Sequence, residues 1–565
     1  MNKLQLAAVM VVAATTLGAC STLPNNTTPQ VLHPYEDHDE EEPVMTPDDS
    51  RSPDQLLRDF FSASALPTGN FSAARSFLSG EAADSWNPDG RMLVLDSIDL
   101  VTTDSGTDLR VFQAHGKLVG SVSTGGAYSP ESANYEAEFT MHHNDGKWRI
   151  TDLPAEVVID RTELRNQYQA QSLYFFERTG EALASDRRWL SSNRESLDSE
   201  LVTLLLQGPS DTLSPGTVSM IPAGASFVGY EGGAYRFAGM TSMDSEERRK
   251  FAAQLVWTLN NAGFRGPFEV IADGAPLVEG LEEMTIDDFS EFNPRDPAST
   301  VSDLYALYDG NLLDVTTEGT EPVPGATGNI QSADVSSQGA VAAVRKLDER
   351  NSQLFMGEIG AGLEESLSGR TLSRPSFELA GDAAWTVVDG SRVVRVKLSE
   401  GQRITESEVD TSALDDIDGE ISVLRLSSTG ARVAMIINGG VYTGVVARSQ
   451  DGEYRIANVR EIYPDIGDSA LALDWQQDGS LIVGTANTDS PIWRIEQDGS
   501  ASTAMASGNV SAPVVALEVS PSAIYLTDSQ AMLELPSADT EANQSSFWRE
   551  VPGVQGRRSA PIVAN

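Results

Sequence analysis

Cys20 is the one residue of this 565-residue chain whose type and position point to a defined covalent chemistry, and it is the only cysteine. A basic residue, Lys3, opens the chain, and an apolar run follows from Leu4 to Leu17. This run is shorter than the roughly 20 residues that a transmembrane helix needs. Small residues then lead into the cysteine, which is the layout of a secretory signal peptide. The sequence therefore predicts that the chain is exported and processed at this point.

The motif Leu17-Gly18-Ala19-Cys20 resembles the bacterial lipobox. In lipoproteins with that motif, the cysteine sulfur carries a diacylglycerol and the signal peptide is cut just before the cysteine. The resemblance implies cleavage between Ala19 and Cys20, with S-diacylglycerol and N-acyl groups on Cys20. It also implies a lipid anchor on the extracytoplasmic face of the cell membrane, with residues 1–19 as the signal peptide. An ordinary secreted protein with one spare cysteine is the alternative.

The histidines offer no comparable chemistry. All five precede residue 170, so the later part of the chain cannot contain a Ser-His-Asp triad. His33 and His38 lie in an acidic stretch where nothing fixes a coordination geometry. His142 and His143 are neighbours on a predicted strand, so their side chains point to opposite faces. No metal site is predicted at any of them.

Two groups of carboxylates deserve the same test. Asp416–Glu420 resembles the start of a calcium loop, but Ile421 replaces the glycine and Ser427 the glutamate that such a loop requires. Asp287-Asp288 and Glu291 could be paired carboxylates for sugar hydrolysis. They lie in a connector, and chance pairs are expected among 83 acidic residues. The sequence predicts no catalytic residue, no cofactor and no metal ligand, and we expect a protein that is not an enzyme.

Composition excludes other classes of function. A net charge of −44 repels nucleic acid and anionic lipid head groups. No polybasic segment accompanies Cys20, so attachment must rest on acyl chains, of which a stable anchor needs two or more. A chain of this length should contain several domains, held together by hydrophobic burial because no disulfide can form.

The first predicted units are a tether and an α+β domain. Residues 20–51 contain the acidic run Glu36–Glu42 and are predicted to form a disordered acidic tether. Ser52-Pro53 reads as a helix start, and a second helix is predicted to end near Gly80. Strand-like alternation follows as far as Leu153. Helices followed by a curved antiparallel sheet resemble the NTF2-like fold, and we assign residues 52–165 to it.

A small α/β domain is predicted next. Asp244 and Glu247 form a capping box that starts a long helix, and the run from Leu213 to Val228 is predicted to be extended. Several dispersed motifs in order resemble the GerMN domain, which we place at residues 170–283. These are Leu173–Phe176, Arg187-Arg188, Leu204–Pro209, Ile221–Gly224, Gln254–Leu259 and Ala272–Pro276.

The remainder is repetitive. The register marks Gly339, Gly381, Gly430, Gly479 and Ala523 are 42, 49, 49 and 44 residues apart. Four positions before each mark is a bulky apolar residue: Val335, Phe377, Leu426, Trp475 and Val519. This period, with several short strands in each repeat, is typical of a β-propeller. A hairpin at residues 304–315 could complete a blade with strands from the carboxyl terminus, so about six blades are predicted over residues 299–565.

The order of lipobox, tether, NTF2-like domain, GerMN domain and propeller resembles the LpqB family of actinobacterial lipoproteins. The resemblance implies a non-catalytic envelope protein that binds the extracellular part of the sensor histidine kinase MtrB. It also implies an effect on cell-wall homeostasis and division through a two-component pathway. Two alternatives remain: a binder of cell-wall glycan or muropeptide, and a propeller hydrolase that works through carboxylates and a metal.

Overall fold

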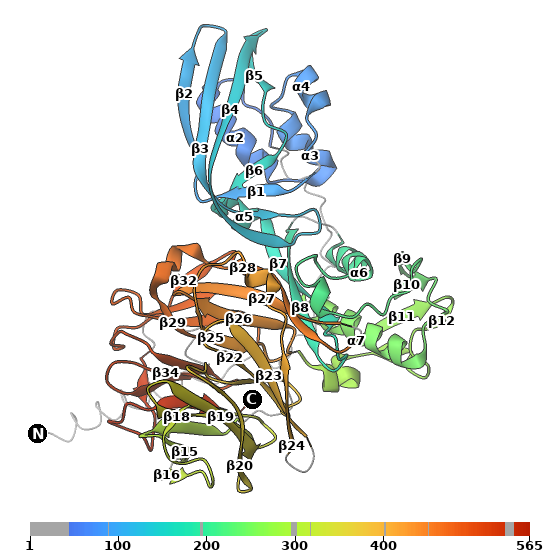
Figure 1. Ribbon diagram of the computed structural model, residues 1–565. Coiled ribbons are helices and arrows are strands. Elements are labelled where there is room, and N and C mark those ends of the chain that lie inside the picture. Colours follow the sequence, from blue (N-terminus) through green and yellow to red (C-terminus); the bar gives the residue numbers. More distant parts are fainter. Residues whose placement is uncertain are drawn as a thin grey trace, which may run out of the picture. The chain divides into compact units, whose positions relative to one another are not determined.

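The computed structural model describes residues 45–564, with gaps at 89, 193–195, 295–301, 317, 400–402, 450 and 537–546. Cys20, the predicted signal peptide and most of the predicted tether lie outside the described residues. Pro47–Asn565 form one compact unit, in which three groups of elements follow one another along the chain (Figure 1).

The first group packs three helices against a six-stranded sheet. The helices are α2 (Pro53–Ser64), α3 (Thr68–Arg75) and α4 (Gly80–Ser85). The strands are β1 (Met92–Leu95), β2 (Asp99–Ser105), β3 (Leu109–Val122), β4 (Tyr128–Asn144), β5 (Lys147–Asp152) and β6 (Val157–Asp160). Phe61 of α2 meets Phe139 of β4 edge-on, with ring centroids 5.2 Å apart. The predicted α+β character of this region is confirmed.

Two details of this region differ from the prediction. The sheet is not wholly antiparallel, because β6 pairs with β1 in parallel. Since β3 already occupies one edge of β1, the returning chain buries Val157–Ile159 at the other edge. Gly80 does not end a helix but begins α4, because the Ser79 hydroxyl accepts a hydrogen bond from the Ala82 N–H at 3.3 Å and caps a new helix.

The second group is an α/β region. It begins with α5 (Arg161–Gln167) and the hairpin of β7 (Tyr168–Phe176) and β8 (Leu183–Ser191). Next come α6 (Leu197–Gln207), η1 (Ser214–Gly216), β9 (Ser226–Glu231), β10 (Ala234–Ala238) and α7 (Ser245–Asn261). The last elements are β11 (Phe268–Ala272), β12 (Ala275–Pro276), β13 (Glu283–Met284) and η2 (Ile286–Phe292). The sheet order is β12-β11-β10-β9, and β13 also pairs with β11.

Local signals explain the main helix of this group. The Asp244 side chain accepts hydrogen bonds from the N–H groups of Glu246 and Glu247, and the Glu247 side chain accepts one from Asp244 N–H, so the predicted capping box is confirmed. The prediction of an extended run from Leu213 to Val228 is wrong at its start. There Pro215, at an early position of the turn, favours the single-turn η1.

The third group is a β-propeller with six blades among the described residues, each a four-stranded antiparallel sheet. Blade 1 contains β14 (Leu304–Tyr308), β15 (Asn311–Thr316), β16 (Gly319–Pro322) and β37 (Ala560–Val563). Blade 2 contains β17 (Ile330–Val335), β18 (Ala340–Asp348), β19 (Asn351–Glu358) and β20 (Gly362–Gly369). Blade 3 contains β21 (Ser376–Phe377), β22 (Ala383–Val388), β23 (Arg392–Ser399) and β24 (Arg403–Glu408).

The remaining blades repeat this plan. Blade 4 follows η3 (Ser412–Leu414) and contains β25 (Ile421–Leu426), β26 (Arg432–Ile437), β27 (Gly440–Arg448) and β28 (Tyr454–Glu461). Blade 5 follows η4 (Pro464–Ser469) and contains β29 (Ala470–Trp475), β30 (Leu481–Thr485), β31 (Ile492–Ile495) and β32 (Ser502–Ala504). Blade 6 contains β33 (Ala516–Val519), β34 (Ala523–Thr527), β35 (Met532–Pro536) and β36 (Arg549–Glu550).

The carboxyl-terminal strand closes the ring. β37 pairs with β14, with Ile562 opposite Tyr305, and so completes blade 1 as predicted. In blades 2 to 6 the first strand is the innermost, and these strands contact one another and β37. Each bulky residue of the sequence repeat, such as Val335 or Trp475, ends an innermost strand. The repeat therefore marks the part of blades 2 to 6 that surrounds the propeller axis.

Candidate functional site

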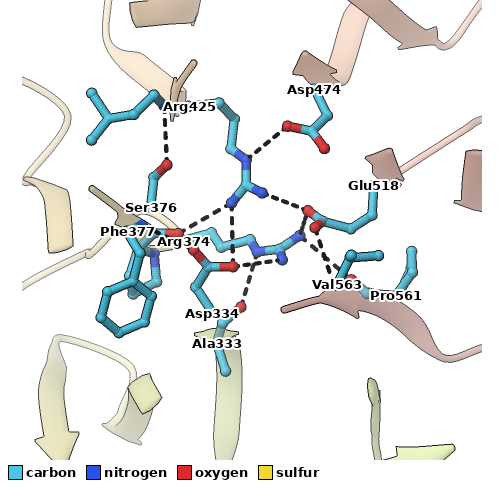
Figure 2. A network of polar contacts seen from close by, with 12 residues as sticks. Ala333, Asp334, Arg374, Ser376, Phe377, Arg425, Asp474, Glu518, Pro561 and Val563 are labelled. Carbon is cyan, nitrogen blue, oxygen red and sulfur yellow. Dashed lines mark hydrogen bonds and ion pairs between the residues drawn. The ribbon is translucent and has the colours of Figure 1, made fainter. Parts of the chain in front are cut away.

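Charged side chains from the innermost strands meet at the propeller axis (Figure 2). They come from Asp334 on β17, Arg425 on β25, Asp474 on β29 and Glu518 on β33, with Arg374 just before β21. We call these five residues the axial network. Asp334, Arg425, Asp474 and Glu518 are 5% exposed or less. Buried charges are stable only when they are paired, so their partners decide what the network can do.

Arg425 is the hub of the axial network. Its Nη2 lies 2.8 Å from Glu518 Oε1, and its Nε lies 3.5 Å from Asp474 Oδ1. Its Nη1 lies 3.7 Å from Asp334 Oδ1 and donates to the Pro375 carbonyl oxygen at 3.3 Å. The guanidinium group thus contacts carboxylates from three other blades at once. Its planar fork of donors is suited to this arrangement.

Arg374 supplies the second positive charge. Its Nη1 lies 2.6 Å from Glu518 Oε1, and its Nη2 lies 3.3 Å from Asp334 Oδ1. Its Nε also donates to the Ala333 carbonyl oxygen at 2.9 Å. Glu518 therefore lies between two guanidinium groups, as Figure 2 shows. Its other oxygen accepts a hydrogen bond from Val563 N–H at 3.3 Å, which attaches the closing strand β37 to blade 6.

Bonds from side chain to backbone join neighbouring blades around the axis. Asp334 accepts from Phe377 N–H at 3.0 Å, and Asp474 accepts from Val519 N–H at 2.8 Å. Between them, the Ser376 hydroxyl accepts from Leu426 N–H and the Arg425 carbonyl accepts from the Trp475 indole N–H, both at 3.0 Å. With the Glu518–Val563 bond, these tethers link the blades in sequence from blade 2 to blade 1.

The electrostatics of the axial network are set by three carboxylates and two guanidinium groups. Burial lowers the pKa of Arg425, but the charges of Glu518, Asp334 and Asp474 outweigh it and raise that pKa above its usual range. Burial raises the pKa of Glu518 from 4.5 to about 7, against the opposing charges of Arg374 and Arg425. The network has one carboxylate more than it has guanidinium groups. Glu518 is its most buried member and can therefore hold a proton near neutral pH.

The arrangement at the axis is suited to closing the ring rather than to reacting. Every member of the axial network contacts an oppositely charged partner. Within the described part of the chain, no group of three or more His, Cys, Asp or Glu side chains is placed to hold a metal ion. No helix in that part combines the length and the apolar character needed to cross a bilayer.

The other residues tested for chemistry are dispersed. His142 shares a hydrogen bond with the Thr151 hydroxyl at 2.8 Å, and the His143 ring lies against Trp148 with centroids 5.0 Å apart. Asp288 accepts hydrogen bonds from Thr285, which lower its pKa, and so caps η2. Glu291 pairs instead with Arg249 at 2.5 Å. Asp416 and its acidic neighbours are exposed between η3 and β25.

A second polar region joins the hairpin of β7 and β8 to blades 4 and 5. Arg187 Nη1 lies 2.8 Å from Glu496 Oε2, and the Trp189 indole donates to Asp498 Oδ2 at 2.9 Å. Arg432 Nη2 donates to the Ser185 carbonyl oxygen at 2.6 Å. Arg187, one of the motif residues of the sequence analysis, therefore contacts the propeller.

A sequence signal for the axial network exists, although no member of the network was predicted. The residue directly before each bulky residue of the repeat is polar: Asp334, Ser376, Arg425, Asp474 and Glu518. Adjacent residues on a strand point to opposite faces, so a polar residue recurring beside a core residue on every innermost strand indicates a shared polar centre. Arg374 follows no such repeat and would still be missed.

The fold and the axial network define a multidomain protein whose six-bladed propeller is closed by internal ion pairs. Residues 310–564 match the family described as "Lipoprotein LpqB beta-propeller domain". Residues 46–165 match "Lipoprotein LpqB, N-terminal domain", and residues 172–278 match "Sporulation and spore germination".

Relatives named "Lipoprotein LpqB" match along the whole chain. The one from Corynebacterium diphtheriae is 40% identical, over 99% of this chain and 98% of the relative. The one from Rhodococcus jostii is 33% identical, over 98% and 97%. The one from Mycobacterium tuberculosis is 30% identical over the full length of both. The chain belongs to the LpqB lipoprotein family, and as a member it is a membrane-anchored lipoprotein.

Proposed function

We propose that this protein is a non-catalytic regulator, anchored through Cys20 on the extracytoplasmic face, that binds the extracellular part of a sensor histidine kinase of the MtrB type. The observation that carries the proposal is the axial network, in which every described charge contacts another side chain of the network. A propeller whose axis is closed in this way offers its blade surfaces and loops for recognition. A shared membrane raises the effective concentration of two anchored partners.

Cross-linking in intact cells, followed by recovery of the full chain, tests the proposal. We expect the kinase among the covalently linked proteins, and a pull-down of its purified extracellular domain by residues 52–565. Recovery of wall fragments and never the kinase would contradict the proposal and favour the glycan-binding alternative. Stoichiometric metal in the purified protein, with hydrolysis that depends on it, would favour the hydrolase alternative.

The anchor has its own test. We expect Cys20→Ala to fold normally, because the variant position precedes the described compact unit, and to leave the membrane fraction because it can carry no lipid. Cell fractionation with immunoblotting measures this. A matched control is Ser21→Ala, which alters the neighbouring residue and should remain bound. A membrane-bound Cys20→Ala protein would show that another feature attaches the chain.

A further inference from the structure

A cavity of about 340 Å³ lies between the β7–β8 hairpin and the loops that follow the innermost strands of blades 4 and 5. It is separate from the axial network, none of whose residues line it. Gln171 and Ser185 line it from the hairpin, and Ser428, Arg432, Trp475 and Gln477 line it from the propeller. Its volume falls in the range of small-molecule sites, roughly 300–1,000 Å³.

Arg432 is the unusual member of this lining. It is half-buried, and within the described residues it makes no ion pair. Its guanidinium group makes one hydrogen bond in that part of the chain, from Nη2 to the Ser185 carbonyl oxygen. Removal from water lowers the pKa of Arg432 to about 10, an effect that nearby Asp186 offsets only in part and Arg460 reinforces. A withdrawn guanidinium group without a carboxylate is costly unless something neutralises it.

The other charges around the cavity are already neutralised. Arg187 contacts Glu496 at 2.8 Å and Asp498 at 3.4 Å. Asp478 contacts Arg494 at 2.6 Å, so its carboxylate does not oppose an incoming anion strongly. The positive charge of Arg432 is therefore the one that an anionic ligand would neutralise. A carboxylate suits it, because a guanidinium group binds both carboxylate oxygens side by side.

The uncharged residues of the lining narrow the chemical class of the ligand further. The side chains of Gln171 and Gln477 form no hydrogen bond within the described residues, and each amide offers both a donor and an acceptor. Ser428 adds an exposed hydroxyl at the cavity, and Trp475 adds apolar surface. Groups that donate and accept, beside the aromatic side chains of Tyr174 and Trp475, match a ring bearing several hydroxyl groups. We propose that this cavity binds a carboxylated sugar, with the carboxylate on Arg432 and the ring hydroxyls on the amide side chains.

The proposal does not depend on the kinase contact, because it concerns a small ligand. A ligand in this cavity would touch the α/β region and the propeller together. Since it would bind only the folded arrangement, it would also stabilise that arrangement in proportion to its concentration. The site therefore predicts both a binding signal and a rise in melting temperature.

The test compares two sugars that differ by one 3-O-lactyl ether group, which carries the carboxylate. N-acetylmuramic acid and N-acetylglucosamine are titrated into the full mature chain in detergent and followed by calorimetry. We expect N-acetylmuramic acid to bind with a Kd below about 1 mM and at least about tenfold more tightly than N-acetylglucosamine. Equal affinity for the two sugars, or no saturable binding up to about 10 mM, would overturn the proposal.

Matched variants locate the site. Arg432→Gln should weaken N-acetylmuramic acid at least about tenfold, or about 1.4 kcal/mol, without changing N-acetylglucosamine. Arg345→Gln is the control, because Arg345 also donates to backbone carbonyl oxygens but lies outside the cavity. Ser428→Trp changes an exposed residue of the lining and should reduce binding by filling part of the cavity. Unchanged binding of N-acetylmuramic acid by both Arg432→Gln and Ser428→Trp would place it elsewhere and refute the assignment.

Discussion

Arg425 and Arg432 of blade 4 are both withdrawn from water, and their surroundings are opposite. Arg425 on β25 contacts three carboxylates, from Asp334, Asp474 and Glu518. Arg432 on β26 contacts a carbonyl oxygen and lines a cavity. Burial lowers the pKa of both guanidinium groups, but only at Arg425 do neighbouring carboxylates more than compensate. An arginine therefore stabilises the structure where carboxylates of the fold neutralise its charge, and it serves recognition where they do not.

The difference follows from the partners that replace water around each guanidinium group. At the axis, folding brings carboxylates from several blades to one guanidinium group, so the charges compensate only when the ring is closed. In the cavity, folding leaves the compensation to a ligand. Charged groups stabilise the fold when the fold itself supplies their partner. They provide specificity when a ligand from solution supplies it.

The largest predicted effect is at the axis. Arg425→Gln removes the hub and leaves Glu518, Asp474 and Asp334 with only Arg374 among them, so we expect a loss of about 3–5 kcal/mol in propeller stability. Urea unfolding followed by tryptophan fluorescence measures it, since Trp475 bonds to the Arg425 carbonyl. Arg345→Gln in blade 2 is the control and should cost less than about 1 kcal/mol. Equal losses for the two variants would show that Arg425 contributes no more to stability than an arginine outside the axial network.

The pH dependence sharpens the axial side of the comparison. Burial raises the pKa of Glu518 from 4.5 to about 7, so between these values the folded chain holds a proton that the unfolded chain has released. The stability that this proton contributes is complete below pH 4.5 and is lost as the pH rises through about 7. The slope is at most about 1.4 kcal/mol per pH unit, since one proton is involved.

The measurement compares Glu518→Gln with the unaltered chain. Between pH 5 and pH 8, the stability of the unaltered propeller should fall relative to that of the variant, which has no proton to lose at this position. Other acidic groups contribute equally to both proteins and cancel in the difference. Parallel pH profiles would mean that Glu518 stays charged between its two arginines throughout this range.

How much of the structure could be predicted depends on how far apart in the sequence the contacting residues lie. Five of the six blades followed from a bulky residue recurring before each turn, because these blades repeat the same local pattern. The sixth blade and its closing strand followed from the hairpin at residues 304–315. The polar residue beside it carried the same periodicity and would have indicated the axial network. Arg374 breaks the repeat, since it reaches the axis from the connection before a two-residue strand.

The cavity could not be predicted in the same way. Ser185 and Arg432 are 247 positions apart in the chain, and no local period links them. Their meeting depends on how the β7–β8 hairpin packs on blades 4 and 5. The motif Arg187-Arg188 was recognised as part of a domain pattern, but only the packing shows that Arg187 contacts Glu496 while Arg188 pairs with buried Asp186.

Arg432→Gln tests the cavity side of the comparison without any ligand. The substitution removes one hydrogen bond to a carbonyl oxygen but also removes a charge that folding has left without a carboxylate. These effects oppose each other, so we expect a stability change below about 1 kcal/mol. Urea unfolding under the conditions used for Arg425→Gln measures it. A loss as large as that of Arg425→Gln would mean that Arg432 is a structural tie, and the contrast between the two arginines would fail.

The smallest effect is expected where charges stay in water. Lys117 of β3 pairs with Asp465 of η4, and both side chains are more than 40% exposed. Water and salt already compensate such charges, and ordering two flexible side chains costs entropy. Lys117→Ala should therefore change stability by less than about 1 kcal/mol, and the change should shrink further in about 1 M salt. A loss beyond that, unaffected by salt, would show that this contact is not solvent-screened and that exposure alone does not separate weak charge pairs from strong ones in this chain.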